Sequence, residues 1–308
     1  MTRPRVVIAE PLASEPVAWL RERAEVIDAP DPESLERELP AAEGLVVRTY
    51  TKVTGETLAR APRLRVVGRA GVGLDNIDLD ACRERGVEVV STPDANTTAV
   101  AEYVLSAALA ALRPLKPLDR AVAREEWERL RREAVTPKQL ADLTVGVLGL
   151  GKTGRGVAAR FRCLARRVIY FDVEEFAEAE RHGAEPVTFD ELLESSDVLT
   201  LHVDARAENH GLIGAAQLAK MKPDAVLVNA ARGVIVDEGA LAAHLGRHPH
   251  ARAVIDVFEP EPFTEDCALL RRPNALLTPH IAAATATAKL AMSWVVRDVM
   301  DALERTRG

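Results

Sequence analysis

The sequence has few cysteines, no excess of basic residues and no apolar run of membrane-spanning length. Cys82, Cys163 and Cys267 lie far apart in 308 residues, and their spacing indicates neither a disulfide framework nor a zinc site. This pattern is typical of a reducing cytoplasm. The formal net charge of -7 disfavours a nucleic-acid partner, because phosphate binding needs a basic surface. The longest apolar stretch, 97–112, is interrupted by Glu102 and is shorter than the roughly 20 residues that a membrane span needs.

Internal repeats, low-complexity segments and long flexible linkers are also missing. The length allows about two domains, each with its own core. Hydrophobic residues make up 47% and charged residues 28%, which is typical of folded soluble proteins rather than disordered ones. Basic residues at the start precede a short apolar run that ends at Glu10, so this segment predicts a first strand rather than a signal peptide.

Short β-branched runs alternate with helical patterns in two series. Strands are expected at 5–10, 24–29, 44–49, 64–70 and 87–92, and then at 144–151, 166–172, 196–203, 224–233, 251–258 and 274–280. Helices are expected at 31–40, 79–86, 97–112 and 118–133, and a final amphipathic helix within 282–308. Such alternation is typical of parallel α/β architecture.

The two series predict two domains. We expect a doubly wound (Rossmann) domain at 97–281 and a smaller flavodoxin-like α/β domain formed by 1–96 and 282–308. The second domain is discontinuous because the apolar face of the last helix must be buried, and we expect it to return to the first strands.

The clearest local motif is a glycine pattern, Gly149-Leu150-Gly151-Lys152-Thr153-Gly154, between a buried strand and a helix. Such glycines serve a tight turn, close approach to a pyrophosphate and helix–strand packing. Backbone N–H groups at the helix N-terminus then bind the phosphates. Asp172 ends the next strand, about twenty residues beyond the glycines, where an acid binds the adenosine ribose diol and repels a 2′-phosphate. We predict NAD rather than NADP; the alternative is that Asp172 only caps a helix.

Polar side chains follow three successive strands of the second series. Arg232 follows 224–231, Glu261 follows 251–258 and His280 ends 274–280. Doubly wound sheets bind ligands beyond the carboxyl ends of their strands, so we expect the three side chains to converge on one cleft. Taken separately, each has a plainer interpretation: a surface salt bridge, a loop acid and a helix cap.

The chain resembles the D-isomer-specific 2-hydroxyacid dehydrogenases, and among them the phosphoglycerate dehydrogenases. The matching stretches, in family order, are VVRTYTKVT, GRAGVGLDNIDLDA, STPDANTTAVAEYV, GVLGLGKTGR, VNAARGVIVDEGAL, DVFEPEP and LTPHIAAAT. The resemblance implies that His280 is the general base, that Glu261 orients its ring and that Arg232 binds the substrate carboxylate. It also implies that the doubly wound domain binds the cofactor and that the smaller domain binds the substrate.

The resemblance also implies further contacts. Arg48 is expected at a substrate phosphate, Val72 and Gly73 at the substrate carboxylate, and Asn96 at the domain crossing. A solvated surface position is the alternative for Arg48. The remaining expected cofactor contacts are Val203, Ala230, Asp256 and Ala283.

Several residues depart from the family pattern. Asp204 and Arg206 stand where proline and threonine are usual, in a loop that borders the cofactor in relatives. Ala284 and Thr287 replace a serine and a glutamate after the histidine. No regulatory domain is expected after the last helix, and therefore no feedback inhibition by serine.

A histidine cluster lies outside these motifs, at His244, His248 and His250. Its spacing permits a metal site, but no acid or cysteine lies close in sequence. We therefore expect a solvated helix end and no bound metal.

Two classes of function follow. The first is hydride transfer on a small 2-hydroxy acid, with D-3-phosphoglycerate, the substrate of the first step of serine biosynthesis, ahead of glyoxylate or hydroxypyruvate reduction. The second is a dinucleotide-sensing, corepressor-like binding protein. The apolar helix at 97–112 predicts a homodimer, because a monomer rarely exposes so much apolar surface.

Overall fold

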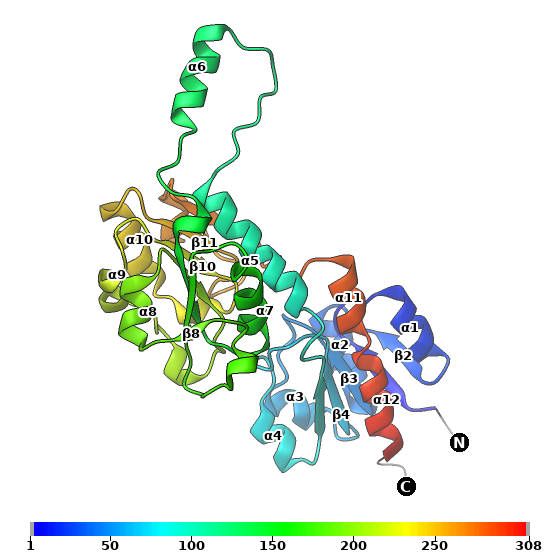
Figure 1. Ribbon diagram of the computed structural model, residues 1–308. Coiled ribbons are helices and arrows are strands. Elements are labelled where there is room, and N and C mark those ends of the chain that lie inside the picture. Colours follow the sequence, from blue (N-terminus) through cyan, green and yellow to red (C-terminus); the bar gives the residue numbers. More distant parts are fainter. Residues whose placement is uncertain (1–2, 306–308) are drawn as a thin grey trace. The chain divides into compact units, whose positions relative to one another are not determined.

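The computed structural model describes residues 3–305, which form two compact units. Unit 1 contains the described residues of Met1–Asn96 and Ala283–Gly308, and unit 2 is Thr97–Ala282. Each unit has one parallel sheet covered by helices (Figure 1). None of the helices in residues 3–305 combines the length and apolar character needed to cross a bilayer.

The sheet of unit 1 has the strand order β2-β1-β3-β4-β5. Its strands are β1 (Arg5–Ile8), β2 (Glu25–Asp28), β3 (Gly44–Val47), β4 (Val66–Arg69) and β5 (Glu88–Ser91), all parallel. This is the flavodoxin-like order, as predicted. The order reverses between β1 and β3, and ligands of such sheets bind at the reversal. Glu10 and Arg48, which follow these two strands, therefore lie at the expected ligand position of unit 1.

The helices of unit 1 are α1 (Ser14–Arg21), α2 (Pro32–Glu38), α3 (Gly55–Arg60), α4 (Leu79–Glu84), α11 (Ala286–Ser293) and α12 (Val295–Arg305). The single final helix expected within 282–308 is wrong, because the chain forms two helices separated at Trp294. Thr285 caps α11 by accepting the N–H of Ala288, which places the preceding residues outside the helix. The predicted return to the first strands is confirmed, since α12 packs so closely on β4 that a Cβ on Gly68 would collide with Val299.

The sheet of unit 2 has the strand order β12-β11-β10-β9-β6-β7-β8. Its strands are β6 (Thr144–Leu148), β7 (Arg167–Phe171), β8 (Glu185–Pro186), β9 (Val198–Leu201), β10 (Val226–Asn229), β11 (Arg252–Ile255) and β12 (Ala275–Leu277). This is the predicted Rossmann topology with one added strand, and its order reverses between β6 and β9. The glycine motif follows β6 at this reversal. The sequence pattern did not predict the short edge strand β8.

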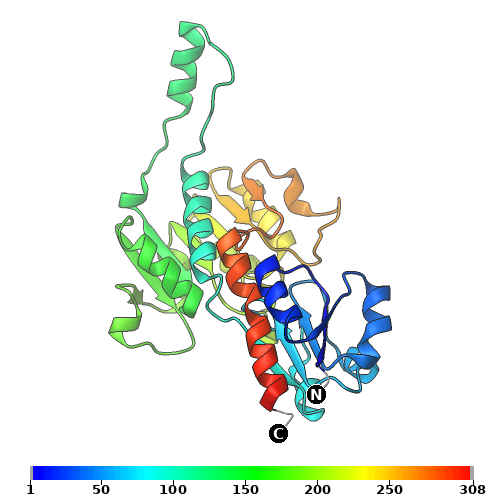
Figure 2. The ribbon, with the colours of Figure 1, turned by 90° about the vertical axis from the view of Figure 1, so that its right-hand side faces the viewer.

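The helices of unit 2 are α5 (Thr97–Leu112), α6 (Arg124–Glu133), α7 (Lys152–Phe161), α8 (Phe189–Ser195), α9 (Ala215–Lys220) and α10 (Glu238–Arg247). Short 3₁₀ turns across the two units lie at Leu39–Ala41, Leu140–Asp142, Glu178–Glu180, Ala207–Asn209, Gly233–Ile235 and Ala268–Arg271. The charged helix predicted at 118–133 begins only at Arg124. Figures 1 and 2 both show α6 at the end of a long excursion away from its sheet.

Candidate active site

The glycine motif forms the turn between β6 and α7. Gly149 has φ +90, a conformation that favours glycine, and a Cβ there would lie 2.9 Å from the backbone of His202. A Cβ on Gly154 would collide with the carbonyl oxygen of Gly149. Gly151, the N-cap of α7, has open space where its Cβ would be. The turn therefore exposes backbone beside a helix N-terminus, which fits a bound pyrophosphate.

Asp172 lies beside this turn, as its predicted role requires. Its Oδ2 accepts the N–H of Leu150 at 2.6 Å, and its Oδ1 accepts the N–H of Glu174 at 3.0 Å. A carboxylate has about four acceptor positions, so two remain for the hydroxyls of a ribose. Lys152 is exposed and Thr153 half-buried in the first turn of α7. These residues fit the adenosine and phosphate parts of NAD.

Arg232 follows β10 and is half-buried. The buried side chain of Asn229 holds the turn before it: its Nδ2 donates to the carbonyl of Arg232 at 2.9 Å, and its Oδ1 accepts the N–H of Ala231 at 3.1 Å. The guanidinium donates to the Ala231 carbonyl at 2.7 Å. A Cβ on Gly233 would collide with the backbone of Phe258, so this glycine lets the Arg232 turn approach the segment that carries Glu261.

Glu261 and His280 form a hydrogen-bonded pair after the neighbouring strands β11 and β12. The ring Nδ1 of His280 lies 2.7 Å from Oε2 of Glu261, and the side chains are 27% and 20% exposed. The other oxygen, Oε1, accepts the N–H of Phe258 at 2.9 Å. Burial raises the pKa of Glu261, but the hydrogen bonds from His280 and Phe258 and the charges of His280 and Arg232 lower it below its ordinary value. The carboxylate is therefore ionised and accepts the Nδ1 proton.

Asp256 holds the backbone around His280. Its carboxylate is fully buried and accepts the N–H groups of Ile281 and Ala282, both at 2.8 Å. Its carbonyl accepts the N–H of His280 at 2.8 Å. Its predicted contact with the cofactor stays a prediction. In the described structure, its contacts make it a support for the histidine.

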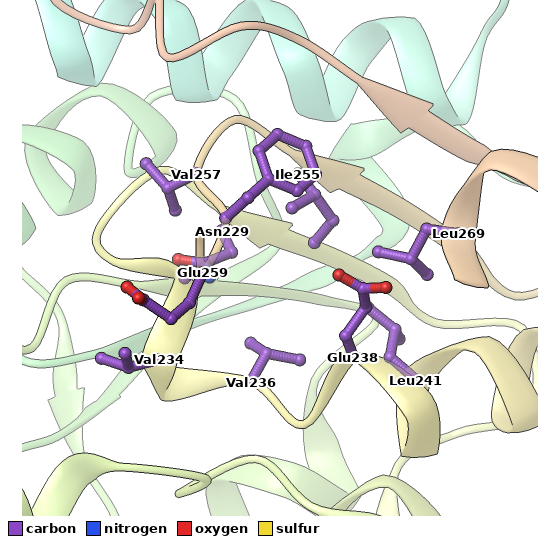
Figure 3. Close-up of a pocket in the computed structure, with 11 residues that line it drawn as sticks. Asn229, Val234, Val236, Glu238, Leu241, Ile255, Val257, Glu259 and Leu269 are labelled. Carbon is purple, nitrogen blue, oxygen red and sulfur yellow. The ribbon is translucent and has the colours of Figure 1, made fainter. Parts of the chain in front are cut away.

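A cavity of about 160 Å³ lies next to this site (Figure 3). Its lining comes from the two segments that carry Arg232 and Glu261: Asn229, Gly233, Val234, Val236, Glu238, Leu241, Ile255, Val257, Phe258, Glu259 and Leu269. The three predicted catalytic side chains are not part of this lining. The cavity therefore shares these two segments with the site but is not lined by the three side chains themselves.

In unit 1, Arg48 belongs to a turn that is built around Glu10. Oε1 of Glu10 accepts the N–H groups of Arg48 and Thr51, both at 2.9 Å, and Oε2 accepts that of Thr49 at 3.0 Å. The N–H of Tyr50 is shared between the two oxygens at 3.2 and 3.3 Å. The Arg48 guanidinium donates to the Pro11 carbonyl at 3.2 Å. The backbone N–H groups of this turn thus donate to Glu10. An anion that binds here would therefore contact the Arg48 side chain rather than these N–H groups.

The other predicted substrate contacts also lie in unit 1. Val72 and Gly73 are half-buried in the turn after β4, where Gly71 takes φ +148. Asn96 is the last residue of unit 1 before α5. Arg232, Glu261 and His280 are thus brought together in unit 2, whereas the contacts of Arg48, Val72, Gly73 and Asn96 with a substrate stay predictions.

The remaining predicted cofactor contacts are spread over the two units. Val203 lies against the glycine turn, 2.9 Å from where a Cβ on Gly149 would be. Ala230 follows β10 and is half-buried, and Ala283 opens the second segment of unit 1. Their contacts with NAD stay predictions.

The two departures in the loop after Val203 pair with each other. Arg206 makes two parallel bonds to the Asp204 carboxylate, from Nε at 2.7 Å and from Nη2 at 2.6 Å. Asn209 donates to the Asp204 carbonyl at 3.0 Å. Where the family pattern has proline and threonine, this chain therefore has two residues that form an ion pair with each other.

The solvated helix end predicted for the histidine cluster is wrong for one member. His244 is only 4% exposed, because it lies on the face of α10 that packs against the core. Its ring centroid lies 4.5 Å from that of His248. His250 is exposed. Within residues 3–305 there is no group of three or more histidine, cysteine or acidic side chains placed to hold a metal ion.

Sequence reasoning missed four residues whose side chains form hydrogen bonds in or next to these turns: Glu10, Asn229, Tyr103 and Thr278. Asn229 carried a signal, because a polar residue ends an otherwise apolar buried strand. The partners of the other three lie far away in sequence, so no local pattern marks them.

Comparison with known proteins places the chain among dehydrogenases. Residues 105–282 match the family described as D-isomer specific 2-hydroxyacid dehydrogenase, NAD binding domain. D-3-phosphoglycerate dehydrogenase from Archaeoglobus fulgidus is 42% identical over 298 residues, which cover 96% of this chain and 56% of that protein. The chain thus spans about half the length of the curated phosphoglycerate dehydrogenases it matches.

Two further proteins match over most of both chains. (S)-Sulfolactate dehydrogenase from Chromohalobacter salexigens is 41% identical over 258 residues, which cover 82% of each protein. The crystal structure of D-lactate dehydrogenase from Aquifex aeolicus complexed with NAD and lactic acid superposes with a TM-score of 0.82 at 27% identity. That match covers 98% of this chain and 96% of the solved one.

Proposed function

The chain belongs to the D-isomer specific 2-hydroxyacid dehydrogenases, and on that premise we propose that it oxidises D-3-phosphoglycerate with NAD, the first step of serine biosynthesis. The proposal rests on the hydrogen bond between His280 and Glu261 and on the positive charge of Arg232, which lowers the pKa of Glu261. Bound NAD supplies the nicotinamide carbon that takes up the hydride. A cytoplasmic setting is part of the proposal and is supported by the three free cysteines.

His280 moves the proton of the substrate hydroxyl. Because Glu261 accepts the Nδ1 proton, the lone pair of the neutral ring is on Nε2. Nε2 takes the hydroxyl proton as the C2–H bond breaks, and returns it in the reverse direction. The Glu261 carboxylate at 2.7 Å stabilises the imidazolium that forms.

Arg232 binds the carboxylate and the C2 oxygen of the substrate. Its guanidinium offers donors in a planar fork that matches a carboxylate. Asn229 fixes the backbone on both sides of Ala231, so the fork starts from one defined position. A half-buried cation at the site also favours anionic substrates over neutral ones.

Arg48 supports a substrate with a second anionic group, because it lies at the ligand-binding reversal of the unit 1 sheet. The phosphate of D-3-phosphoglycerate is such a group, and so is the sulfonate of (S)-sulfolactate. The two acids have the same spatial arrangement of groups at C2. Their R and S descriptors differ only because sulfur has a higher priority than oxygen in the R/S rules, so that the sulfur-bearing carbon outranks the carboxylate. Sulfolactate is therefore the second candidate, favoured by a relative that matches over 82% of its length.

The test is NADH oxidation with four keto acids: 3-phosphohydroxypyruvate, 3-sulfopyruvate, hydroxypyruvate and glyoxylate. We expect one of the first two to have the highest kcat/KM and His280→Ala to abolish turnover. Arg48→Ala should lower kcat/KM for the preferred acid at least tenfold, whereas the exposed control Arg83→Ala should not. An unchanged preference in Arg48→Ala would refute the phosphate role. NAD binding without turnover of any acid would instead favour the sensor.

We also propose a homodimer, with the excursion at 113–139 as its contact. The expected interface on α5 is used within the chain, since that helix buries Ala99, Val100, Ala101, Val104, Ala107, Ala108 and Ala111. Exposed apolar side chains gather instead on the excursion: Leu115 (92%), Val135 (78%), Trp127 (49%) and Leu118 (47%). Helix α6, which Figures 1 and 2 show away from its sheet, buries none of its residues in this chain. Such a projecting apolar surface supports a second copy as its partner.

Sedimentation velocity tests the dimer. We expect the wild type to sediment as a dimer and the double variant Leu115→Ser/Trp127→Ser as a monomer with unchanged NAD affinity. A control pair on the exposed charges of α6, Arg124→Ser/Arg131→Ser, should stay dimeric. A monomeric wild type would contradict the proposal.

A further inference from the structure

A chain of three polar groups connects helix α5 with the segment that carries His280. The hydroxyl of Tyr103 lies 2.6 Å from Oγ1 of Thr278, and the Thr278 hydroxyl donates to Oδ1 of Asp256 at 2.6 Å. Because the single Thr278 proton goes to the carboxylate, Tyr103 must be the donor to Thr278. Burial raises the pKa of Tyr103 and the hydrogen bond with Thr278 lowers it, but the charge and hydrogen bonding of the nearby Asp256 carboxylate raise it further, to about 12. The tyrosine hydroxyl therefore keeps its proton at neutral pH.

The segment that carries His280, where this series of hydrogen bonds ends, is strained. His280 has φ +53, in the left-handed region that residues with a Cβ rarely adopt, and such a conformation costs about 1–3 kcal/mol. It persists only where the surroundings determine it. Asp256 fixes this segment through three hydrogen bonds. Its carbonyl accepts the N–H of His280, and its carboxylate accepts those of Ile281 and Ala282. The position of the histidine ring therefore depends on where the Asp256 carboxylate is held.

Asp256 is fully buried, and its carboxylate needs donors to remain there. The N–H groups of Ile281 and Ala282 belong to the segment that must be positioned. The Thr278 hydroxyl is oriented from outside that segment, by a tyrosine 175 residues earlier in sequence. Tyr103 thus joins α5 to the strained turn.

We propose that Tyr103 is a positioning residue for the general base His280 and acts through Thr278 and Asp256. This inference rests on the proposed role of His280. Removing the Tyr103 hydroxyl leaves Thr278 without its orienting donor, so the Thr278 proton has more than one direction available. Asp256 then holds the turn less firmly, and the imidazole samples positions that do not reach the substrate.

The test compares Tyr103→Phe, Thr278→Val and the double variant in the full-length protein. Thr278→Ser is the conservative variant, because it keeps the hydroxyl. Tyr170→Phe is the matched control, since that buried tyrosine packs edge-on against Phe176 and is not part of this chain of hydrogen bonds. Three quantities are measured: kcat and KM for the keto acid that is turned over, Tm, and amide hydrogen exchange of the peptide containing 278–282 in the protein without cofactor or substrate.

We expect Tyr103→Phe to lower kcat about three- to tenfold, the effect of one lost hydrogen bond, with KM for NADH within about twofold. Exchange in 278–282 should accelerate, while Tyr170→Phe changes neither kcat nor this exchange. The double variant should be no slower than Thr278→Val, because both changes break the same chain. Thr278→Ser should retain most of the activity.

Other results would overturn the inference. Wild-type kcat and exchange in Tyr103→Phe, or multiplicative losses in the double variant, would show that Tyr103 does not act through Thr278. A lower Tm with raised KM and unchanged kcat would indicate packing alone. The exchange measurement needs no substrate, so it decides whether Tyr103 holds the turn even where the proposed reaction fails.

Discussion

Glu10→Gln changes one atom in the structure and disturbs the whole Arg48 turn. The carboxylate accepts four consecutive N–H groups, those of residues 48–51. With its amide oxygen at the Oε1 position, glutamine turns its NH₂ toward the N–H of Thr49, and two donors then face each other. One half-buried hydrogen bond is lost, and the remaining ones are no longer made to a charged group. We expect the free energy of unfolding to fall by about 2–4 kcal/mol at pH 7.

The effect should depend on pH in one direction. Burial raises the pKa of Glu10, but the N–H groups of Thr51, Arg48, Tyr50 and Thr49 together lower it below its ordinary value of 4.5. A lowered folded-state pKa means that the ionised carboxylate stabilises the fold fully above the unfolded value, and that this stability is lost as pH falls through the folded value. The difference between wild type and Glu10→Gln should therefore narrow below about pH 4.5.

Urea unfolding followed by tryptophan fluorescence measures the effect in unit 1. Trp19 and Trp294 pack against each other there, 6.1 Å apart, and Trp127→Phe removes the signal from unit 2. A loss of 2–4 kcal/mol moves the midpoint by about 1–2 M urea. The exposed Glu15→Gln serves as control and should change stability by less than about 0.5 kcal/mol. An equally small change in Glu10→Gln, or a difference between the two proteins that does not narrow below about pH 4.5, would refute the reasoning.

Three further predictions concern unit 2. Gly154→Ala places a Cβ against the Gly149 carbonyl and should weaken NAD binding at least tenfold in calorimetry; unchanged affinity would contradict the described turn. Glu261→Gln replaces the ionised partner of the His280 ring and should lower kcat at least tenfold with little change in KM, and wild-type kcat would remove Glu261 from the mechanism. Burial lowers the pKa of His202 to about 4, so its ring resonances should stay constant in NMR spectra between about pH 5.5 and 8, and a titration in that range would show an accessible ring.

The strand pattern was readable from the sequence because it depends on local rules. Runs such as 44–47 and 226–229 are apolar on both faces, as strands covered by helices on both sides must be. The glycine motif was equally readable, since Gly149, Gly151 and Gly154 each answer a local backbone requirement. The error at the last helix has a local cause too: the pattern from 282 to 308 is amphipathic throughout, and only the capped start at Thr285 and the break at Trp294 divide it.

The proposed catalytic residues could be predicted from the sequence only in part. Parallel strands end at the same edge of a sheet, so Arg232, Glu261 and His280 could be expected on one side of β10, β11 and β12 from sequence order alone. That His280 and Glu261 share a hydrogen bond of 2.7 Å could not. It depends on how two loops fold back, and loop conformation is set by contacts that the strand pattern does not encode.

The amino-acid sequence by itself determined the two parallel sheets and the nucleotide-binding turn, because periodicity and glycine requirements act between near neighbours. It also indicated which side chains to propose as catalytic, because they follow three successive strands. Only the tertiary structure decided how those groups are held. Glu10 meets its turn across 38 residues and Tyr103 meets Thr278 across 175. Partners so distant in sequence are brought together by packing. The left-handed backbone at His280 is held by its bonds to Asp256, which also form only in the folded chain.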